Sequence, residues 1–413
     1  MIVKNRPLLI LILGLLSAIG PFSIDMYLPG FPTIAADLDT TVDTVAYSLS
    51  SFFIGICLGQ LICGPLLDRF GRKRPLYVGL VIYIIASLGC AMSNSVEQLI
   101  VFRFLQALGG CVGMVAPGAI VRDSFPAKEN AKIFSLLILI LGVSPIIAPT
   151  VGSLVIASYG WHAVFIVLSI ITGLLLLAVI FFLPESKQPD PSMSLRPKPI
   201  LKSFLHVLKQ PQFFTYALSG AIAAAGLFAY LAGSPFVFMA LFKMSEQQYG
   251  WIFGFVAAGL IISSQLNNLL LKNYDSAQII RTVLVVQTIV GLLLCFGTIF
   301  NWLSLYSTIG LIFLFLSCQG FSFPNSAALS LAPFTKEAGS ASALMGAFQM
   351  GCGAAASALV GLINNGTAVP MTSVMAGCAF FGLVILSLGR KQLEYKSRIE
   401  DVEEQAFEQI EKY

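Results

Sequence analysis

The chain has 413 residues, of which 57% are hydrophobic and 11% are charged, and its formal net charge is +4 at pH 7. Ordinary soluble domains carry roughly 25% charged residues, so this composition excludes a soluble enzyme or binding domain and indicates a membrane protein. The cations are scattered between apolar runs rather than gathered in one patch, so we expect no nucleic-acid partner.

Apolar runs long enough to cross a bilayer, about 20 residues each, recur along the whole chain. They predict an all-α membrane protein with twelve transmembrane helices. The expected spans are residues 8–31, 45–67, 75–92, 99–121, 133–157, 162–183, 213–242, 249–271, 279–300, 303–326, 340–363 and 370–388.

The first expected span contains one carboxylate, Asp25, between Pro21 and Pro29. An ionisable residue inside a membrane is costly and usually functional. A lone carboxylate can exchange protons when its partner moves or its hydration changes, so we interpret Asp25 as the proton acceptor. The alternatives are a fixed partner for a buried cation, or a helix-breaking turn beside Pro29.

A charged loop, residues 64–74, separates the second and third spans. Its glycines and proline break helices, and its arginines and lysine must stay in water. Because such cations remain on the cytoplasmic side of a membrane, the loop is expected to be a cytoplasmic hairpin.

The same loop suggests a latch between distant spans. Asp68 is expected to dock at the start of the eleventh span, near residues 339–342. Free N–H groups and the helix dipole give a helix partial positive charge at its start. Arg72 or Lys73 is expected to reach Asp123 at the end of the fourth span. A cluster that only sets the topology would explain the cations but not Asp68.

The fourth span contains the second buried charge, Arg103. Counting residues along the helices places Arg103 and Asp25 at one depth, each roughly 9 Å below the same membrane boundary. Arg103 is therefore expected to pair electrostatically with Asp25 or to anchor the substrate.

The fifth span carries Gly142, Pro145, Pro149 and Gly152 at spacings that put all of them on one helix face. Glycine permits close approach of a neighbouring helix, and proline bends the helix at a defined place. The pattern predicts a kinked, tightly packed helix, with an ordinary membrane kink as the alternative.

Prolines interrupt the chain near its middle. We therefore expect an N-terminal six-helix half (1–183), a cytoplasmic linker (184–212), a C-terminal six-helix half (213–389) and a cytoplasmic tail helix (390–413). Similar segments after the fourth and tenth spans indicate that the halves are pseudo-symmetric repeats.

Two segments outside the spans have a helical pattern. Apolar residues between 200 and 208 fit a short amphipathic helix on the inner membrane surface, and a disordered linker fits equally well. The sequence of the tail, residues 390–413, predicts a solvated amphipathic helix. The alternative is that this helix docks at the cytoplasmic opening of the transport path.

The distribution of cations predicts the orientation. Lysines and arginines lie beside one set of span ends, whereas Lys243 is the only cation expected at the opposite set. Because short cytoplasmic loops are enriched in such residues, both termini are expected in the cytoplasm.

Neutral polar and aromatic residues within the spans are candidates for substrate contacts, each competing with a role in packing, and they suit a small, moderately polar substrate. These candidates are Tyr27, Tyr47, Gln60, Gln106, Tyr230, Ser234, Asn267, Asn268, Gln319 and Gln349. With 2 histidines and no G-x-x-x-x-G-K-[ST] loop, the sequence predicts no metal site, no cofactor and no enzyme activity. A proton gradient is the expected energy source.

Several of these segments resemble known signatures. The loop resembles the signature loop of the major facilitator superfamily, and the fifth-span pattern resembles the antiporter motif in the form typical of the Bcr/CflA drug-resistance group. Residues 23–29, 103–109 and 233–236 also resemble signatures of that group. The resemblance assigns gating roles to Gly64, Asp68, Arg69, Gly71, Arg72, Lys73, Asp123, Gly142, Pro145, Pro149 and Gly152.

This resemblance implies two parallel six-helix repeats with the substrate site between them near mid-membrane. It implies proton-coupled export of small molecules, drugs above all, by a monomer in a bacterial inner membrane. The implied partners are the substrate, protons and the bilayer. The alternatives on the same fold are export of a metabolite such as an amino acid, uptake instead of export, and a sensor that does not transport.

Overall fold

A computed structural model describes residues 6–125, 127–190, 197–334 and 338–411. Within these residues, 12 helical stretches are long and apolar enough to cross a membrane. The predicted all-α architecture with twelve spans is therefore confirmed. Many of the large apolar side chains on the outside of the bundle, such as Ile85 and Leu174, are exposed as expected for contact with lipid.

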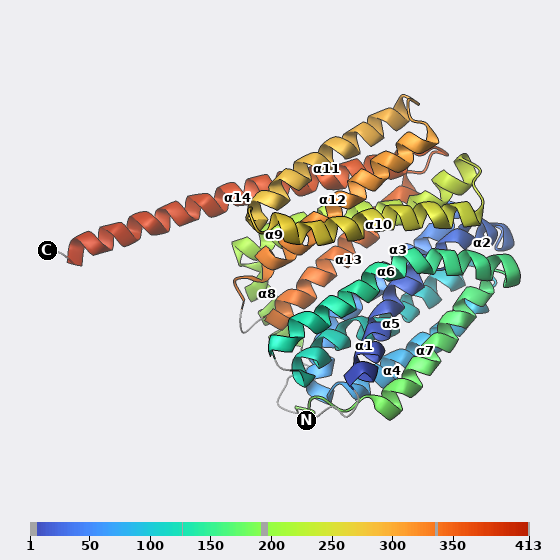
Figure 1. Cartoon of the computed structure of the whole chain (residues 1–413), viewed down its shortest axis with the longest axis horizontal. Helices are drawn as coiled ribbons and strands as arrows, with labels where there is room; N and C mark the ends of the chain where they lie inside the picture. Colours follow the sequence, from blue (N-terminus) through green and yellow to red (C-terminus); the bar gives the residue numbers. More distant parts are fainter. Residues whose placement is uncertain (1–5, 126, 191–196, 335–337, 412–413) are drawn as a thin grey trace.

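The helices fall into two groups in space, which Figure 1 shows in blue to green and in yellow to red. The first group comprises α1 (Arg6–Asp25), α2 (Phe31–Asp37), α3 (Val42–Phe70), α4 (Lys73–Ala91), α5 (Val96–Ser124), α6 (Ala127–Tyr159) and α7 (His162–Phe182). The second comprises α9 (Pro211–Pro235), α10 (Glu246–Leu270), α11 (Ser276–Ile299), α12 (Leu305–Leu331), α13 (Ala338–Leu362) and α14 (Val369–Glu411).

The two groups meet along two pairs of helices. Helix α3 packs against α13, and α6 packs against α10 (Figure 1). The short turn η1 (Leu28–Gly30), which interrupts the first span, and η2 (Phe236–Leu241), which continues the seventh, also lie at this interface. The interface between the halves therefore runs past the break in the first span.

The two ends of the bundle differ. The N-terminus, the linker helix α8 (Pro197–Leu208) and the projecting part of α14 lie at one end, here called the terminal end (Figure 1). Helix α2 lies at the opposite end, here called the far end. The linker thus contains a helix, and its expected place on the inner membrane surface stays a prediction.

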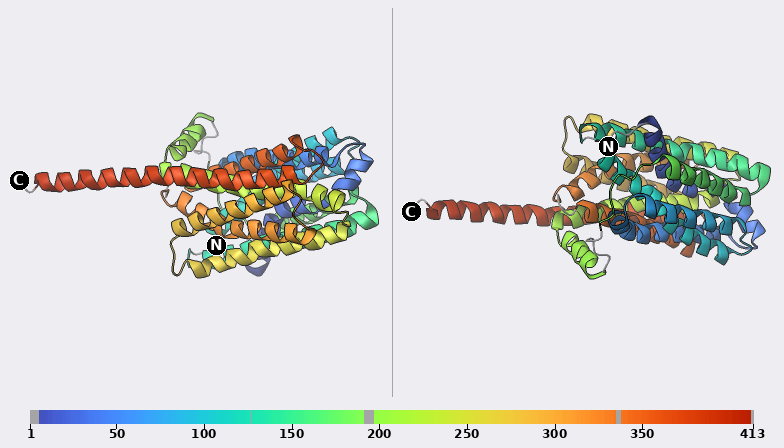
Figure 2. Two further views of the ribbon diagram at one scale, coloured as in Figure 1. Left: turned by 90° about the horizontal axis from the view of Figure 1, so that it is seen from above. Right: turned by 90° about the horizontal axis from the view of Figure 1, so that it is seen from below.

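The tail does not form a separate helix. Helix α14 continues without a break from the last span to Glu411, so the expected boundary after residue 389 is not a helix end. Figure 2 shows this extension leading away from the bundle rather than across its end. Gly389 lies within this helix and permits close packing, since a Cβ there would lie 2.3 Å from Thr215 of α9.

Local side-chain caps determine where several helices begin. Thr41, Ser95 and Ser304 each accept a hydrogen bond from the backbone N–H three residues later. Ser245 and Gln248 form a reciprocal capping box at the start of α10. Such caps satisfy N–H groups that the first helical turn leaves free, so the starts of these helices follow from local sequence.

Candidate functional site

The first span breaks at its buried carboxylate. Helix α1 ends at Asp25, and Pro29 lies within the turn that follows. The Asp25 side chain is buried and forms no hydrogen bond or ion pair within the described residues. Tyr230 of α9 and Tyr249 of α10 lie within electrostatic range of it. The carboxylate therefore lies at the interface between the halves, at a helix end.

Arg103 is held inside the N-terminal half. Its side chain is fully buried, and Nη1 donates to Gln106 Oε1 at 2.6 Å. The guanidinium lies 4.3 Å from the ring centre of Tyr27 and 4.1 Å from that of Phe52, so cation–π attraction offsets part of the cost of burying the charge. Nε and Nη2 have no hydrogen-bond partner among the described residues.

The expected pair of Asp25 and Arg103 is not formed in this structure. Counting residues along the helices gives the depth of each charge in the membrane, but it does not determine the rotation of each helix. The break after Asp25 leaves its carboxylate beside α9 and α10, whereas the ring of Tyr27 faces Arg103. The functional roles assigned to both residues stay predictions.

The fifth-span pattern brings α6 against this break. A Cβ on Gly152 would lie 1.9 Å from the Met26 carbonyl oxygen, so only glycine allows α6 to pack on the turn beside Asp25. Gly142 faces Ile261 of α10, and the backbone of Pro149 faces Gly250 of the same helix. The predicted close packing is present, and it links the break to the opposite half.

The charged loop at the terminal end forms a dense network. Arg72 donates from Nε to Asp123 Oδ2 at 2.7 Å and from Nη1 to Asp68 Oδ1 at 3.0 Å. Burial lowers the pKa of Arg72, but hydrogen bonds and charges of Asp123 and Asp68 hold the pKa above its ordinary value. The predicted contact between Arg72 and Asp123 is therefore present, and Arg72 stays charged.

Two residues of this network were not identified from the sequence. Glu185 accepts from the backbone N–H groups of Arg72 at 2.6 Å and Lys73 at 3.2 Å, which caps the start of α4. Lys187 donates to Asp68 at 2.7 Å. Gly71 has φ +81°, which favours glycine, and a Cβ there would meet Glu185 at 3.0 Å. The start of the linker is thus bound to the loop.

The expected docking of Asp68 on α13 is not present. Asp68 and Ser340 line opposite walls of one cavity of about 610 Å³, and no hydrogen bond joins Asp68 to the described residues at the start of α13. The reason is that the halves stand apart at this point, so Asp68 is bound by Arg72 and Lys187 instead. The expected loop is shorter than residues 64–74: α3 continues through Gly64, Pro65 and Arg69 to Phe70, so the helix break falls at Gly71, and Gly64 lines the cavity from within α3.

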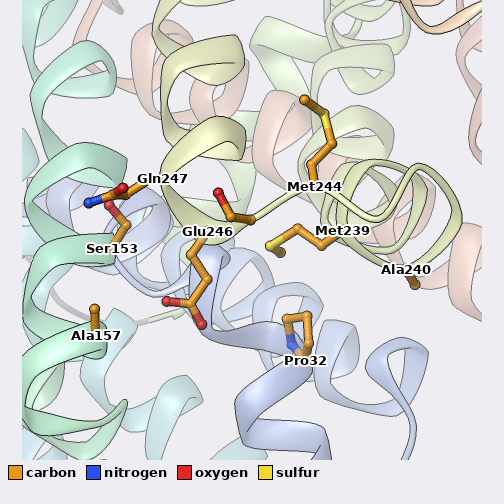
Figure 3. Close-up of a pocket in the computed structure, with 9 residues that line it drawn as sticks. Pro32, Ser153, Ala157, Met239, Ala240, Met244, Glu246 and Gln247 are labelled. Atoms are coloured by element: carbon orange, nitrogen blue, oxygen red, sulfur yellow. The ribbon is translucent and has the colours of Figure 1, made fainter.

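At the far end the halves are joined by polar contacts. Thr33 donates to Glu246 at 3.0 Å, Ser50 and Ser357 hydroxyls lie 2.8 Å apart, and Asn364 donates to Asp43. Beside the first contact is a cavity of about 580 Å³, drawn in Figure 3 with Glu246 and two methionines on its walls. Polar contacts thus join the halves across the far end, and a cavity between the halves lies at each end of the bundle.

The remaining substrate candidates fall into different environments. Gln60 lines the terminal-end cavity, and its Oε1 has no hydrogen-bond partner among the described residues. Tyr230 is buried within electrostatic range of Asp25, and its hydroxyl is also unpartnered within the described part. Ser234 shares a hydrogen bond of 2.9 Å with Tyr249. These three residues lie in the wall between the halves.

Other candidates are engaged in packing or lie elsewhere. Asn267 accepts from Asn325 at 2.7 Å and Gln319 accepts from Gln287 at 3.0 Å, so both link helices within the C-terminal half. Asn268 is exposed, on a different side of α10 from Asn267, and it lines neither cavity. Tyr47 packs on α13 at Gly361, and Gln349 is half-buried on α13.

The loop network makes a testable contribution to stability. Asp123→Asn removes the charged acceptor of the buried Arg72, so we expect a loss of about 1.5–3 kcal/mol, because hydrogen bonds to charged groups contribute this much. Thermal unfolding of the purified protein measures the change. Arg122→Gln is the matched control, since Arg122 is exposed and, among the described residues, its Nε donates to the Gly118 carbonyl of its own helix and to no carboxylate. Equal melting temperatures for Asp123→Asn and the control would contradict this role.

The chain is similar to transporters along most of its length. Over 395 residues it is 34% identical to "Uncharacterized MFS-type transporter YdgK" of Bacillus subtilis, covering 94% of this chain and 98% of that protein. It is 31% identical to "Bicyclomycin resistance protein homolog" of Haemophilus influenzae, covering 92% and 96%. It is 28% identical to "Multidrug resistance protein MdtL" of Escherichia coli, covering 89% and 91%.

Solved structures agree on the fold. A mutant of the nucleoside transporter NupG aligns with TM-score 0.73 at 14% identity, covering 94% of this chain and 99% of that chain. The D-xylose-proton symporter aligns with TM-score 0.73 at 14% identity, covering 93% and 97%. These likenesses show a shared architecture.

The family assignment rests on the sequence match itself. Residues 13–360 match the Major Facilitator Superfamily. The relative named for bicyclomycin resistance agrees with the signatures of the loop, the first span and the fifth span. The chain belongs to the Major Facilitator Superfamily of membrane transporters.

Proposed function

We propose that this protein exports small-molecule drugs or toxic compounds across the bacterial inner membrane in exchange for protons, by alternating access and without a cofactor. The observation that carries the proposal is Asp25, a buried carboxylate with no ion-pair partner among the described residues, at a helix break between the halves. The names of the bicyclomycin-resistance and multidrug-resistance relatives support drugs as the substrate class.

Asp25 is suited to couple proton movement to a change of conformation. It ends a broken helix in contact with α6, and Tyr230 and Tyr249 of the other half lie within electrostatic range. Protonation removes a buried negative charge, which changes the free energy of any state in which that charge lacks a partner. Arg103, whose Nε and Nη2 donate to no acceptor among the described residues, supplies the positive charge for substrate or for Asp25 in another state.

The terminal end faces the cytoplasm in this proposal. The cations of the loop and linker lie there, and positive residues are retained on that side. The cavity of about 610 Å³ between α3, α8 and α13 then opens toward the cytoplasm and admits the substrate. In the opposite state Asp68 leaves Lys187 and docks at the start of α13, which closes this cavity.

Gln60 is the proposed polar contact at the inner end of the substrate path. Its unpartnered oxygen lies at the wall of the cavity against Gly346 of α13. A neutral amide on a largely apolar wall suits an uncharged or moderately polar compound, which agrees with the expected substrate class.

Drug accumulation in whole cells tests the proposal. A bacterium deficient in drug efflux and expressing this protein is expected to accumulate less radiolabelled bicyclomycin than the same strain with an empty vector. An uncoupler that collapses the proton gradient should remove the difference, because export against a concentration gradient needs that energy. Equal accumulation with and without the protein, for bicyclomycin and chloramphenicol alike, would contradict drug export.

A further inference from the structure

The linker helix α8 has two faces with different surroundings. Its inward face carries Ile200, Ser203, Phe204 and Val207 at helical spacing. Val207 is fully buried, and Phe204 packs with it against the start of α9 and α13. Ser203 donates to Ser340 of α13 at 2.9 Å. The inward face therefore fixes α8 to the terminal end of the C-terminal half.

This inward face also forms part of the terminal-end cavity. Ile200, Ser203 and Phe204 line it together with Asp68 of α3 and Ser340 of α13. Helix α8 thus acts as a wall between the cavity and its surroundings. Any interaction on the outward face of α8 is transmitted to the cavity through one short helix.

The outward face combines cations with exposed leucines. Leu201 is 57% exposed and Leu205 is 47% exposed, which is unusual at the water-filled end of a bundle. Exposed basic side chains share this face at the same helical spacing: Lys198, Lys202, His206 and Lys209. The sequence has no Asp or Glu between Asp190 and Glu246, so no carboxylate within α8 offsets these charges.

The position of α8 brings this face to the level of the membrane surface. It ends just before Pro211, where the seventh span begins, and it contacts the start of α13. Figure 2 shows α8 projecting sideways from the bundle at the end where α14 leaves it. A helix at the ends of the spans, and outside their perimeter, lies beside lipid headgroups.

We propose that the outward face of α8 binds anionic phospholipid headgroups. Leu201 and Leu205 enter the boundary of the acyl chains, and Lys198 and Lys202 contact the negatively charged headgroups beside them. Charge complementarity distinguishes this partner from neutral phospholipid, which would satisfy the leucines but leave the cations in water. Headgroup binding holds α8 in place as the wall of the cavity.

Lipid-specific quenching of a tryptophan on this face tests the proposal. The full-length protein carrying Leu205→Trp is reconstituted in vesicles of phosphatidylcholine with 30% phosphatidylglycerol, with bromine on the chains of one lipid or the other. The fluorescence of the 3 native tryptophans is measured in the unsubstituted protein and subtracted. At equal brominated fraction, brominated phosphatidylglycerol is expected to quench about twofold more, because the lysines enrich anionic lipid beside the helix.

The charge on α8 is tested separately from its folding. Adding Lys198→Gln and Lys202→Gln should make the two brominated lipids quench equally, while adding Lys272→Gln, an exposed lysine between α10 and α11, should not. Leu201→Trp repeats the measurement one turn earlier. Equal quenching by both lipids without the glutamine substitutions, or quenching by neither lipid, would overturn the proposal.

Discussion

Replacing Asp25 with Asn is expected to abolish uphill export while the protein still folds. Asparagine keeps the size of the side chain and part of its hydrogen-bonding capacity, but it cannot take up or release a proton. Because Asp25 has no ion-pair partner in the described structure, the substitution leaves no buried cation without its partner. Accumulation of labelled drug in everted membrane vesicles with an imposed pH gradient measures the effect, and accumulation should fall to the passive level.

Asp39→Asn is the matched control for this prediction. Asp39 is exposed in the turn after α2, and its φ of +49° suits asparagine as well as aspartate. The Asp39→Asn variant should therefore export drug at the rate of the unsubstituted protein. Expression and membrane insertion of both variants are measured alongside. If Asp25→Asn vesicles concentrate drug as well as Asp39→Asn vesicles, another group couples the proton.

The second large effect is expected at Gly152. In Gly152→Ala the new Cβ would lie 1.9 Å from the carbonyl oxygen of Met26, which belongs to the backbone and cannot swing aside. The turn beside Asp25 or the whole of α6 must shift. Overpacking of this kind costs about 1–3 kcal/mol, so the melting temperature should fall and most export should be lost.

Gly142→Ala provides the comparison within the same motif. Its Cβ would lie 3.4 Å from the side chain of Ile261, which is close to an ordinary contact and can adjust. We expect near-normal stability and export. The same loss in both variants would indicate that the glycines act through helix propensity alone and would contradict the proposed contact with Met26.

The spans could be predicted from the sequence because bilayer thickness imposes a length on every apolar run. The contact between Arg72 and Asp123 could also be predicted, since opposite charges at two neighbouring span ends attract each other. Glu185 and Lys187 could not, because they lie more than a hundred residues from the loop and nothing in their local sequence indicates a cap. Such contacts follow from packing of the linker.

Two other expectations depended on information that a single sequence does not contain. The docking of Asp68 belongs to one arrangement of the halves, and the structure describes another, in which Lys187 takes its place. The pairing of Arg103 depended on helix rotation and on which aromatic rings fill the space. Tyr27 was expected as a substrate contact, and the structure places its ring against the Arg103 guanidinium. The substrate-contact role of Tyr27 stays a prediction.

Proton movement driven by substrate tests the central claim most directly. Sealed proteoliposomes containing a pH-sensitive dye, with no initial pH gradient, are given an outward or inward gradient of unlabelled bicyclomycin. The account predicts that drug movement in one direction drives proton movement in the other in vesicles with the unsubstituted protein, and no proton movement in vesicles with Asp25→Asn. Drug movement without any change of internal pH in the unsubstituted protein, or equal proton movement in both proteins, would contradict it.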